Sequence, residues 1–211
     1  MMDSVIEAFR LKDETRTGWE LRGVTSPESV ADHSWGTAFL VLVHADEAGV
    51  DRTRALEIAL VHDLAEAVTG DVATRVAGMD DRSGLRRKHD DEREAMLRLT
   101  SGYQAATATR IRSLWEEYEA SETPEARFVR DMNLIDMCLQ AFVYERDRRY
   151  DADAPNAHFP DFEGLDEFFA TTRPRLSTRF GEQLFGRLVA RYRTLPRVAD
   201  RGGPYLEPRR E

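Results

Sequence analysis

The chain has 211 residues, of which 41% are hydrophobic and 33% are charged, and these values are typical of a single soluble globular domain. The composition excludes a disordered or a collagen-like chain. The formal net charge of -9 would repel a phosphate backbone, and the arginines are scattered among acidic residues. A nucleic acid polymer is therefore not an expected partner.

Cysteine content and hydropathy indicate the compartment. The single cysteine, Cys138, cannot form an internal disulfide. Asp3 and Glu7 interrupt the first apolar residues, which argues against a signal peptide. The longest stretch without a charged residue, 33–45, falls short of the ~20 residues that a membrane-spanning helix needs. We expect a cytoplasmic protein that does not contact membranes.

Apolar residues recur at spacings of three and four, and no sustained alternation indicates a strand, so the sequence predicts an all-α fold. The first clear helix is expected to begin at Ser26, Pro27 and Glu28, which combine a capping residue, a proline suited to the first turn and an acidic residue. It should end at Gly49.

Further helices and connections follow from the same signals. Polar segments rich in helix breakers are expected at 73–88 and 147–166. Residues 1–195 are predicted to form one domain, and 196–211, with three prolines and two glycines, a loose tail. The remaining predicted helices are 52–69, closed by Gly70, then 86–99, 105–119, 124–146 and 173–195.

The predicted helix 52–69 carries a group of hydrophilic side chains. His62 and Glu66 are four residues apart and share a face, Asp63 is adjacent, and Asp71 follows the helix end. A histidine and three carboxylates that converge in a buried place need a positive partner, and a divalent metal is one such partner. A solvated charged helix face explains the same residues, so this group alone leaves both interpretations open.

His33 adds a second imidazole on an otherwise core-facing helix. It is compatible with a hydrogen-bonded core histidine and with a metal ligand contributed by a neighbouring helix. A histidine, a His-Asp pair 29 residues later and a carboxylate or amide on a later helix form the ligand pattern of the HD superfamily of metal-dependent phosphohydrolases.

The resemblance extends to one family of HD-domain proteins, the 5'-deoxynucleotidases, and covers residues 9–146 in collinear order. It rests on Arg16-Thr17-Gly18-Trp19, on Pro27-Glu28-Ser29-Val30-Ala31-Asp32-His33, on Val61-His62-Asp63-Leu64-Ala65-Glu66 with Gly70-Asp71, on Leu114-Trp115-Glu116-Glu117-Tyr118-Glu119, and on the segment 128–145.

The resemblance implies an HD-domain helical bundle, a homodimer, a nucleotide substrate and removal of the 5'-phosphate from deoxynucleoside monophosphates. It implies one divalent cation, which is Co, Mn, Mg, Fe, Ni or Zn, with His33, His62 and Asp63 as ligands. Glu66 and Asp71 would handle the attacking water and the leaving alkoxide.

Arg16 and Trp19 fall in the segment that lines the substrate site in that family. The planar guanidinium of Arg16 suits a phosphate, and the ring of Trp19 can wall off the sugar. The alternative is a surface arginine beside a packed tryptophan, and the sequence leaves that alternative open.

One position departs from the family pattern, because the later metal-ligating aspartate falls on Asn133. An amide oxygen can bind a cation but brings no charge, so metal affinity should fall. Asp136, one turn along on nearly the same face, could partly substitute, whereas Asp131 projects to the far side.

Other functions fit parts of this pattern. An HD hydrolase acting on nucleoside triphosphates or on a modified nucleotide of specialised metabolism would use the same metal. A weakened or inactive nucleotide-binding protein is compatible with Asn133, although Glu66 and Asp71 argue against it. A di-iron HD oxygenase needs additional histidines near the pair, and His44, His89 and His158 do not have that spacing.

Overall fold

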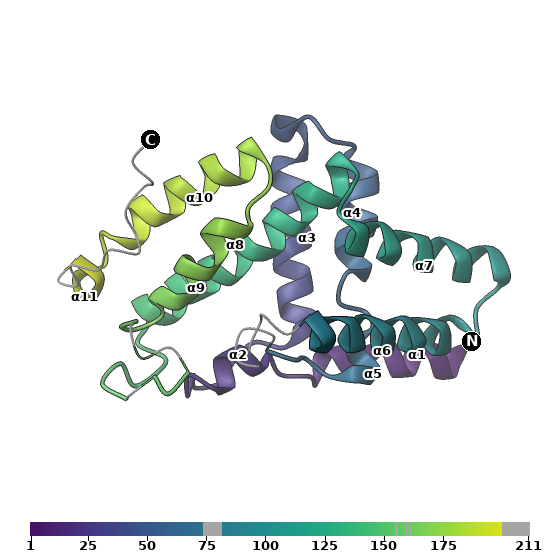
Figure 1. The fold of residues 1–211 in the computed structure, drawn as a ribbon, viewed down its shortest axis with the longest axis horizontal. Coiled ribbons are helices and arrows are strands. Elements are labelled where there is room, and N and C mark those ends of the chain that lie inside the picture. Colours follow the sequence, from purple (N-terminus) through teal and green to yellow (C-terminus); the bar gives the residue numbers. More distant parts are fainter. Residues whose placement is uncertain (74–81, 155, 159, 161, 200–211) are drawn as a thin grey trace.

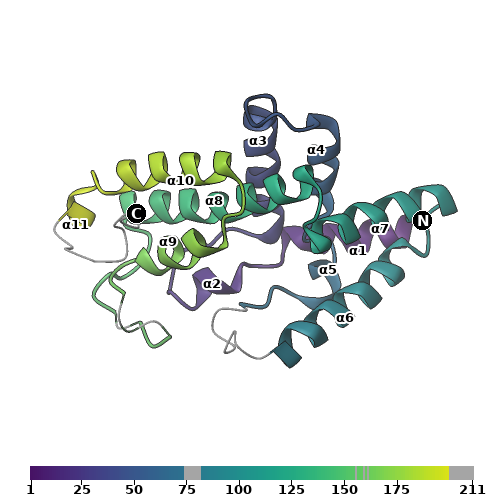
Figure 2. The ribbon, with the colours of Figure 1, turned by 45° about the horizontal axis from the view of Figure 1, so that its top comes forward.

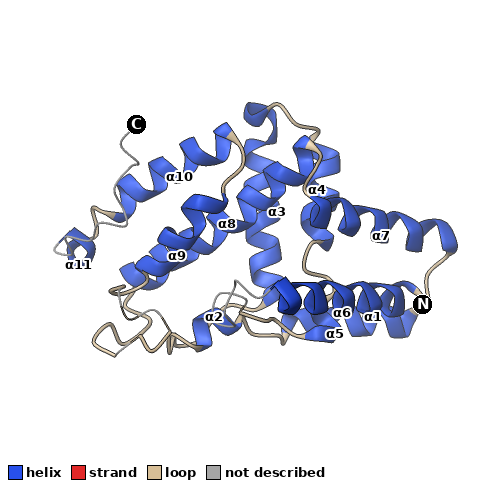
Figure 3. Ribbon diagram, in the orientation of Figure 1, coloured by secondary structure: helices blue, strands red, loops and turns tan. Residues whose placement is uncertain are grey.

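The structure is a computed structural model that describes residues 1–73, 82–154, 156–158, 160 and 162–199. Within these residues, helices are the regular elements, apart from an isolated antiparallel bridge between Thr15 and Ser29 (Figure 3). The prediction of an all-α fold is confirmed. None of the described helices is long and apolar enough to cross a membrane.

The helices in chain order are α1 (Met2–Ala8), the 3-10 helix η1 (Phe9–Lys12), α2 (Thr17–Glu20), α3 (Val30–Ala48), α4 (Arg52–Val61), α5 (Glu66–Thr69), α6 (Arg82–Thr100), α7 (Ala105–Ala120), α8 (Pro124–Arg146), α9 (Asp166–Thr172), the 3-10 helix η2 (Arg173–Arg175), α10 (Arg179–Tyr192) and α11 (Pro196–Ala199).

Helix α8 is central, and α3, α4, α7, α9 and α10 all pack against it. Figures 1 and 2 show α3 crossing α8 while α10 runs alongside it. The larger core cluster gathers on α8 and extends along the chain from Trp19 to Val198. A smaller cluster joins η1, α5, α6 and α7 around Met96 and Trp115. Helix α4 contributes Ala59 to the first cluster and α5 contributes Ala67 to the second, so the turn between them connects the two clusters.

Helix α3 begins later than predicted. Ser29, rather than Ser26, is the capping residue, because its side chain accepts from the Asp32 backbone while the Asp32 carboxylate accepts from the Ser29 backbone. Ser26 instead has a positive φ of 52° in the turn before the helix. The predicted end at Gly49 is confirmed, since Gly49 has a left-handed conformation with φ of 73°.

The predicted helix 52–69 is interrupted. α4 ends at Val61 and α5 starts at Glu66, and the turn between them is held by short-range backbone bonds, from Leu64 to Val61 and from Glu66 to Asp63. His62 and Asp63 lie on this turn. His62 keeps a helical backbone conformation, with φ of -59° and ψ of -39°, and Gly70 ends α5 as predicted.

The C-terminal prediction was wrong in two places. The expected helix 173–195 is divided into η2 and α10 because Thr178 caps α10 by accepting from Gly181, and Asp131 accepts bonds from both Ser177 and Thr178. Residues 196–199 form α11, with Val198 buried in the core, rather than part of a loose tail. Residues 200–211, and residues 74–81 of the first polar connection, lie outside the described residues.

Candidate metal site and nucleotide pocket

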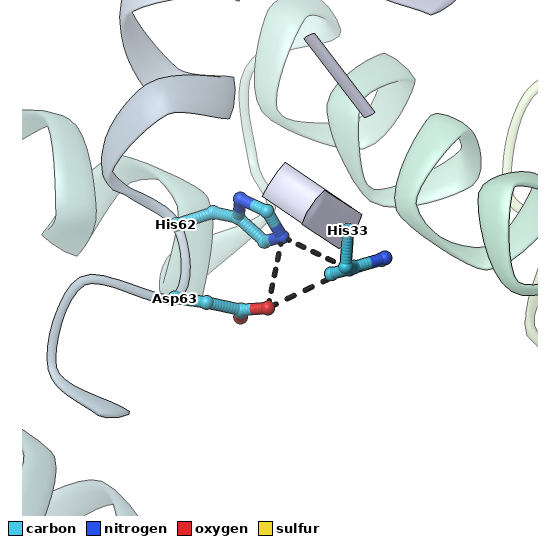
Figure 4. A group of neighbouring side chains, drawn as sticks. All are labelled: His33, His62 and Asp63. Carbon is cyan, nitrogen blue, oxygen red and sulfur yellow. Dashed lines mark hydrogen bonds and ion pairs between the residues drawn. The ribbon is translucent and has the colours of Figure 1, made fainter. Parts of the chain in front are cut away.

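His33 on α3 and His62 and Asp63 on the turn after α4 point their donor atoms at one another (Figure 4). His33 Nε2 lies 3.4 Å from His62 Nε2 and 3.5 Å from Asp63 Oδ2, and His62 Nε2 lies 3.2 Å from the same oxygen. Two ligand atoms that are each about 2.1 Å from a tetrahedral ion lie about 3.4 Å apart. The observed triangle therefore fits one divalent cation.

A buried, unpartnered oxygen supports this fit. Asp63 Oδ2 is inaccessible to solvent and has no hydrogen-bond partner among the described residues. A buried carboxylate oxygen without a partner is costly unless a cation neutralises it. The two imidazoles and the carboxylate are also the donor types that borderline divalent metals prefer.

Each imidazole is oriented through its other nitrogen. His33 Nδ1 lies 2.6 Å from Asp136 Oδ2 on α8, and His62 Nδ1 lies 2.8 Å from the carbonyl oxygen of Ala59. These acceptors place the ring proton on Nδ1 and leave the Nε2 lone pairs directed at the shared centre. Asp136 thus lies behind His33 instead of beside Asp63, so the expectation that it could substitute as a ligand was wrong.

Burial and charge set the protonation of these groups. Burial and the nearby Arg16 lower the pKa of His33 to about 3. Burial acts in the same direction on His62, but the adjacent Asp63 outweighs it and raises the pKa of His62. Burial would also raise the pKa of Asp63, yet the adjacent His62, with His33 and Arg16 nearby, holds it well below its usual range. His33 is therefore neutral and Asp63 ionised near neutral pH, as metal ligands must be.

Arg16 faces two carboxylates of the site. Its Nη1 lies 3.4 Å from Asp71 Oδ1 and 3.6 Å from Asp63 Oδ2. Burial opposes its charge, but these carboxylates outweigh burial and raise the pKa of Arg16. Asp71 is held in turn by the Thr17 backbone N–H, which donates to its Oδ2 at 2.6 Å, and by Glu14, which accepts from its backbone.

Glu66 lies at the first position of α5 and is 5% exposed. Its Oε1 is 3.7 Å from Lys88 Nζ, and its Oε2 is buried without a hydrogen-bond partner among the described residues. Burial and then the charges of Asp63 and Asp71 raise the pKa of Glu66 well above its usual value. The group can therefore hold a proton beside the metal site.

Trp19 is a core residue as well as a wall of the site. It is 1% exposed, stacks on Phe168 with ring centroids 4.1 Å apart, and contacts Tyr144 edge-on at 5.0 Å. Its Nε1 donates to Glu28 Oε1 at 2.8 Å. Trp19 is therefore packed in the core, as one interpretation of the sequence expected, and it also lines the cavity, which is compatible with the other.

These residues surround one cavity of about 340 Å³, large enough for a nucleotide-sized ligand. The cavity is lined by seven of the residues singled out in the sequence, namely Arg16, Trp19, His62, Asp63, Glu66, Asp71 and Asn133. His33 lies directly behind this wall, against His62 and Asp63.

Asn133 lies near the metal site without showing a ligand role. Its Nδ2 donates to the hydroxyl of Tyr118 at 2.6 Å, and the Tyr118 ring lies 5.2 Å from the His62 ring. Asn133 as a fourth metal ligand stays a prediction. Asp131 is buried under α10, on the far side as expected.

Several lining residues were not identified from the sequence as site residues. They are Lys88, Arg130, Glu167, Phe168 and Arg175. Arg130 had a local signal, since it precedes Asn133 by three residues and shares its helix face. The others come from distant segments and no spacing rule connects them to the His-Asp pair.

Comparison with known proteins agrees with this geometry. A sequence profile described as HD domain matches residues 8–172. The 5'-deoxynucleotidase HDDC2 of Danio rerio is 36% identical over 148 residues, covering 68% of this chain and 71% of the relative. The 5'-deoxynucleotidase hdd1 of Schizosaccharomyces pombe is 37% identical over 141 residues, covering 65% and 68%.

Solved structures share the fold. A protein from Pyrococcus horikoshii superposes with a TM-score of 0.68 at 29% identity, covering 92% of this chain and 99% of that one. A protein from Magnetospirillum magnetotacticum, described as a predicted metal-dependent phosphohydrolase, has a TM-score of 0.66 at 25% identity and covers 98% of this chain and 94% of its own.

Proposed function

Because the chain belongs to the HD domain family, we propose that it is a metal-dependent phosphohydrolase that removes the 5'-phosphate from deoxynucleoside monophosphates. The observation that carries this proposal is the convergence of His33 Nε2, His62 Nε2 and Asp63 Oδ2 within 3.5 Å of one another beside a nucleotide-sized cavity. The names of the relatives support the substrate class.

His33, His62 and Asp63 would hold a divalent cation, with Asn133 as the proposed fourth ligand. When bound, the cation supplies Lewis-acid polarisation of the phosphoryl oxygens and activation of water. The donor set suits several divalent metals, so the identity of the metal is left to experiment.

The protein's own residues complete the proposed reaction. Arg16 binds the phosphate with its planar fork of donors, and Asp71, itself anchored by Thr17, orients the guanidinium. Glu66 Oε2, which has no hydrogen-bond partner among the described residues, exchanges a proton with the water or with the leaving oxygen, and Asp71 is the second residue proposed for this step. Trp19 and Phe168 present apolar rings to the sugar.

Phosphate release from the 5'- and 3'-monophosphates of 2'-deoxyadenosine tests this proposal. We expect the 5' isomer to be hydrolysed with a kcat/KM at least about tenfold higher, because only that isomer brings its phosphate to Arg16 with the sugar against Trp19. Equal rates for the isomers, or no release from either with any divalent metal, would overturn the assignment.

We expect Trp19→Ala to destabilise the fold by about 3–5 kcal/mol, because it removes a large buried side chain from the core. Trp19→Phe should cost less, since an aromatic ring can still stack on Phe168. Urea unfolding of both variants checks this. If Trp19→Ala keeps the wild-type urea midpoint, the core role of Trp19 is wrong. The contact of Trp19 with the sugar is tested separately, by comparing the ratio of deoxy- to ribonucleotide hydrolysis rates between Trp19→Phe and the wild type.

We also propose a homodimer formed through an apolar surface on α3 and α4. Trp35, Phe39, Leu42 and Val43 follow one helix face at helical spacing, Leu60 adds to them from α4, and each is at least 49% exposed. Trp35 and Phe39 stack at 5.4 Å. Several large apolar side chains exposed on neighbouring helices are typical of an interface. Sedimentation should show a dimer that Phe39→Asp dissociates; a wild-type monomer would refute it.

The extent of the domain and the location of the protein in the cell are also proposed. We propose that the predicted domain, residues 1–195, works as a single HD domain that also includes α11, supported by a core cluster whose members extend from Trp19 to Val198. A cytoplasmic location is consistent with the single cysteine, Cys138, which is buried and cannot form a disulfide within the chain.

A further inference from the structure

Two arginines face the same cavity at some distance from Arg16. Arg130 lies on α8, one turn before Asn133, and Arg175 lies in η2. The Arg130 guanidinium lies 5.4 Å from the centre of the Tyr118 ring, and that ring lies 5.2 Å from the ring of His62. The Tyr118 ring therefore lies between Arg130 and the candidate metal site, and Arg175 lines the same cavity.

Neither arginine has an acidic partner in the described part of the chain. Arg130 Nη1 donates to the hydroxyl of Ser121 at 2.8 Å, which leaves its charge uncompensated. Among the residues that the structure describes, none forms a hydrogen bond or ion pair with the Arg175 guanidinium. Other arginines of the cavity differ: Arg16 faces Asp71, and Arg22 Nε lies 3.0 Å from Glu167 Oε1.

The two charges also act on each other. The surrounding protein and then the charge of Arg130 lower the pKa of Arg175. Two like charges that line one cavity, with no acidic partner among the described residues, are unfavourable in the free protein. An anion bound between them would replace this repulsion with charge-assisted hydrogen bonds.

Asn133 also contributes to the positive charge of this part of the cavity. The family pattern has an aspartate at this position, and residues three apart on a helix are close enough to form an ion pair. An aspartate here would neutralise part of the charge of Arg130. The neutral amide, whose Nδ2 donates to the Tyr118 hydroxyl at 2.6 Å, does not neutralise the charge of Arg130. That charge is therefore available to bind an anionic ligand.

We propose that Arg130 and Arg175 form a second anion subsite, so that the preferred ligand is a nucleotide with a second phosphate in addition to the 5'-phosphate at the metal site. The inference rests on the proposed function for the place of the first phosphate. The second phosphate can belong to a 5'-diphosphate chain or to the 3' position of the sugar, and the same guanidinium chemistry would recognise either.

Calorimetric binding to the full-length, metal-loaded protein tests the subsite, with Glu66→Gln as the background to slow hydrolysis. The ligands are the 5'-monophosphate, 5'-diphosphate and 3',5'-bisphosphate of 2'-deoxyadenosine. We expect at least one doubly phosphorylated ligand to bind about tenfold or more tightly than the monophosphate, because charged hydrogen bonds have this scale. The arm that shows the gain identifies the source of the second phosphate.

Arg130→Gln and Arg175→Gln should each remove most of that gain while changing the affinity for the monophosphate by less than about threefold. Arg127→Gln is the matched control, because Arg127 is on the same helix, donates to the Glu122 carbonyl and does not line the cavity. The Arg127→Gln variant should keep the gain in affinity for the doubly phosphorylated ligand. Equal affinities for all three ligands, or a gain that survives both cavity substitutions, would overturn the subsite.

The proposed function can fail separately. If the wild-type protein releases no phosphate from any nucleotide but the doubly phosphorylated ligand still binds more tightly through Arg130 and Arg175, the subsite stands and the reaction is wrong. If phosphate is released from monophosphates and the arginine variants show no selective loss, the reaction stands and the subsite is wrong.

Asn133→Asp gives an independent prediction. The added carboxylate should tighten metal binding, since affinity for hard cations rises with charged ligands, and it should reduce the preference for the second phosphate by pairing with Arg130. Titration calorimetry with the metal alone and with the three nucleotides measures both effects. Unchanged metal affinity together with an unchanged preference would contradict both roles of Asn133.

Discussion

Glu66→Gln should lower kcat for a deoxynucleoside 5'-monophosphate by about 100-fold or more, which is the usual scale for the loss of a group that transfers a proton. The substitution keeps the size of the buried side chain but removes its ability to exchange a proton at Oε2. Metal content should stay near the wild-type value, because the triangle of His33, His62 and Asp63 does not include Glu66.

Glu57→Gln is the matched control for this variant. Glu57 lies on the neighbouring helix α4, pairs with Arg110 and does not line the cavity. Its kcat should equal that of the wild type. A Glu66→Gln enzyme with near-normal kcat, or one that has lost its metal, would show that Glu66 does not have the role assigned to it.

Gly36→Ala should weaken metal binding by about 10- to 100-fold, the effect expected when a residue that orients a ligand is disturbed. A Cβ atom at position 36 would lie 2.0 Å from Asp136 Oδ1, so the carboxylate must move away. His33 Nδ1 would then lose its acceptor and the ring its fixed orientation. Calorimetric titration with Mn(II) or Co(II) measures the loss, and Asp136→Ala should reproduce it.

The control for Gly36→Ala is Gly186→Ala in α10, where an added Cβ meets nothing within 4 Å. Alanine is a better helix former than glycine, so this variant should melt at or above the wild-type temperature with unchanged metal affinity. If Gly36→Ala folds and binds metal as tightly as the wild type, Asp136 does not position His33.

The helical fold was predictable from the sequence because apolar spacing and caps act locally. Gly49 and Gly70 ended helices where expected, and α7 and α8 have bounds within a residue of those predicted. The interruption after Val61 was not predictable, since the periodicity continues through it. The structure shows that tight backbone bonds and the contact of His62 with Ala59 accompany that turn.

The site was partly predictable for the same reason. His62, Asp63 and Glu66 are close in sequence, and His33 entered through a spacing typical of a known family. The role of Asp136 could not be read from its position, because its hydrogen bond to His33 depends on how α3 crosses α8 and on the space that Gly36 leaves. Arg175 joins the cavity only through the packing of the C-terminal segment.

The metal dependence of the reaction is measured as phosphate release from 2'-deoxyadenosine 5'-monophosphate by chelator-treated protein, before and after a divalent metal is added back. We expect release to stop when the metal is removed and to return with Co(II), Mn(II) or another divalent ion, and we expect Asp63→Ala protein to be inactive under both conditions. Undiminished release by the metal-free protein, or by the Asp63→Ala variant, would contradict the proposed metal dependence.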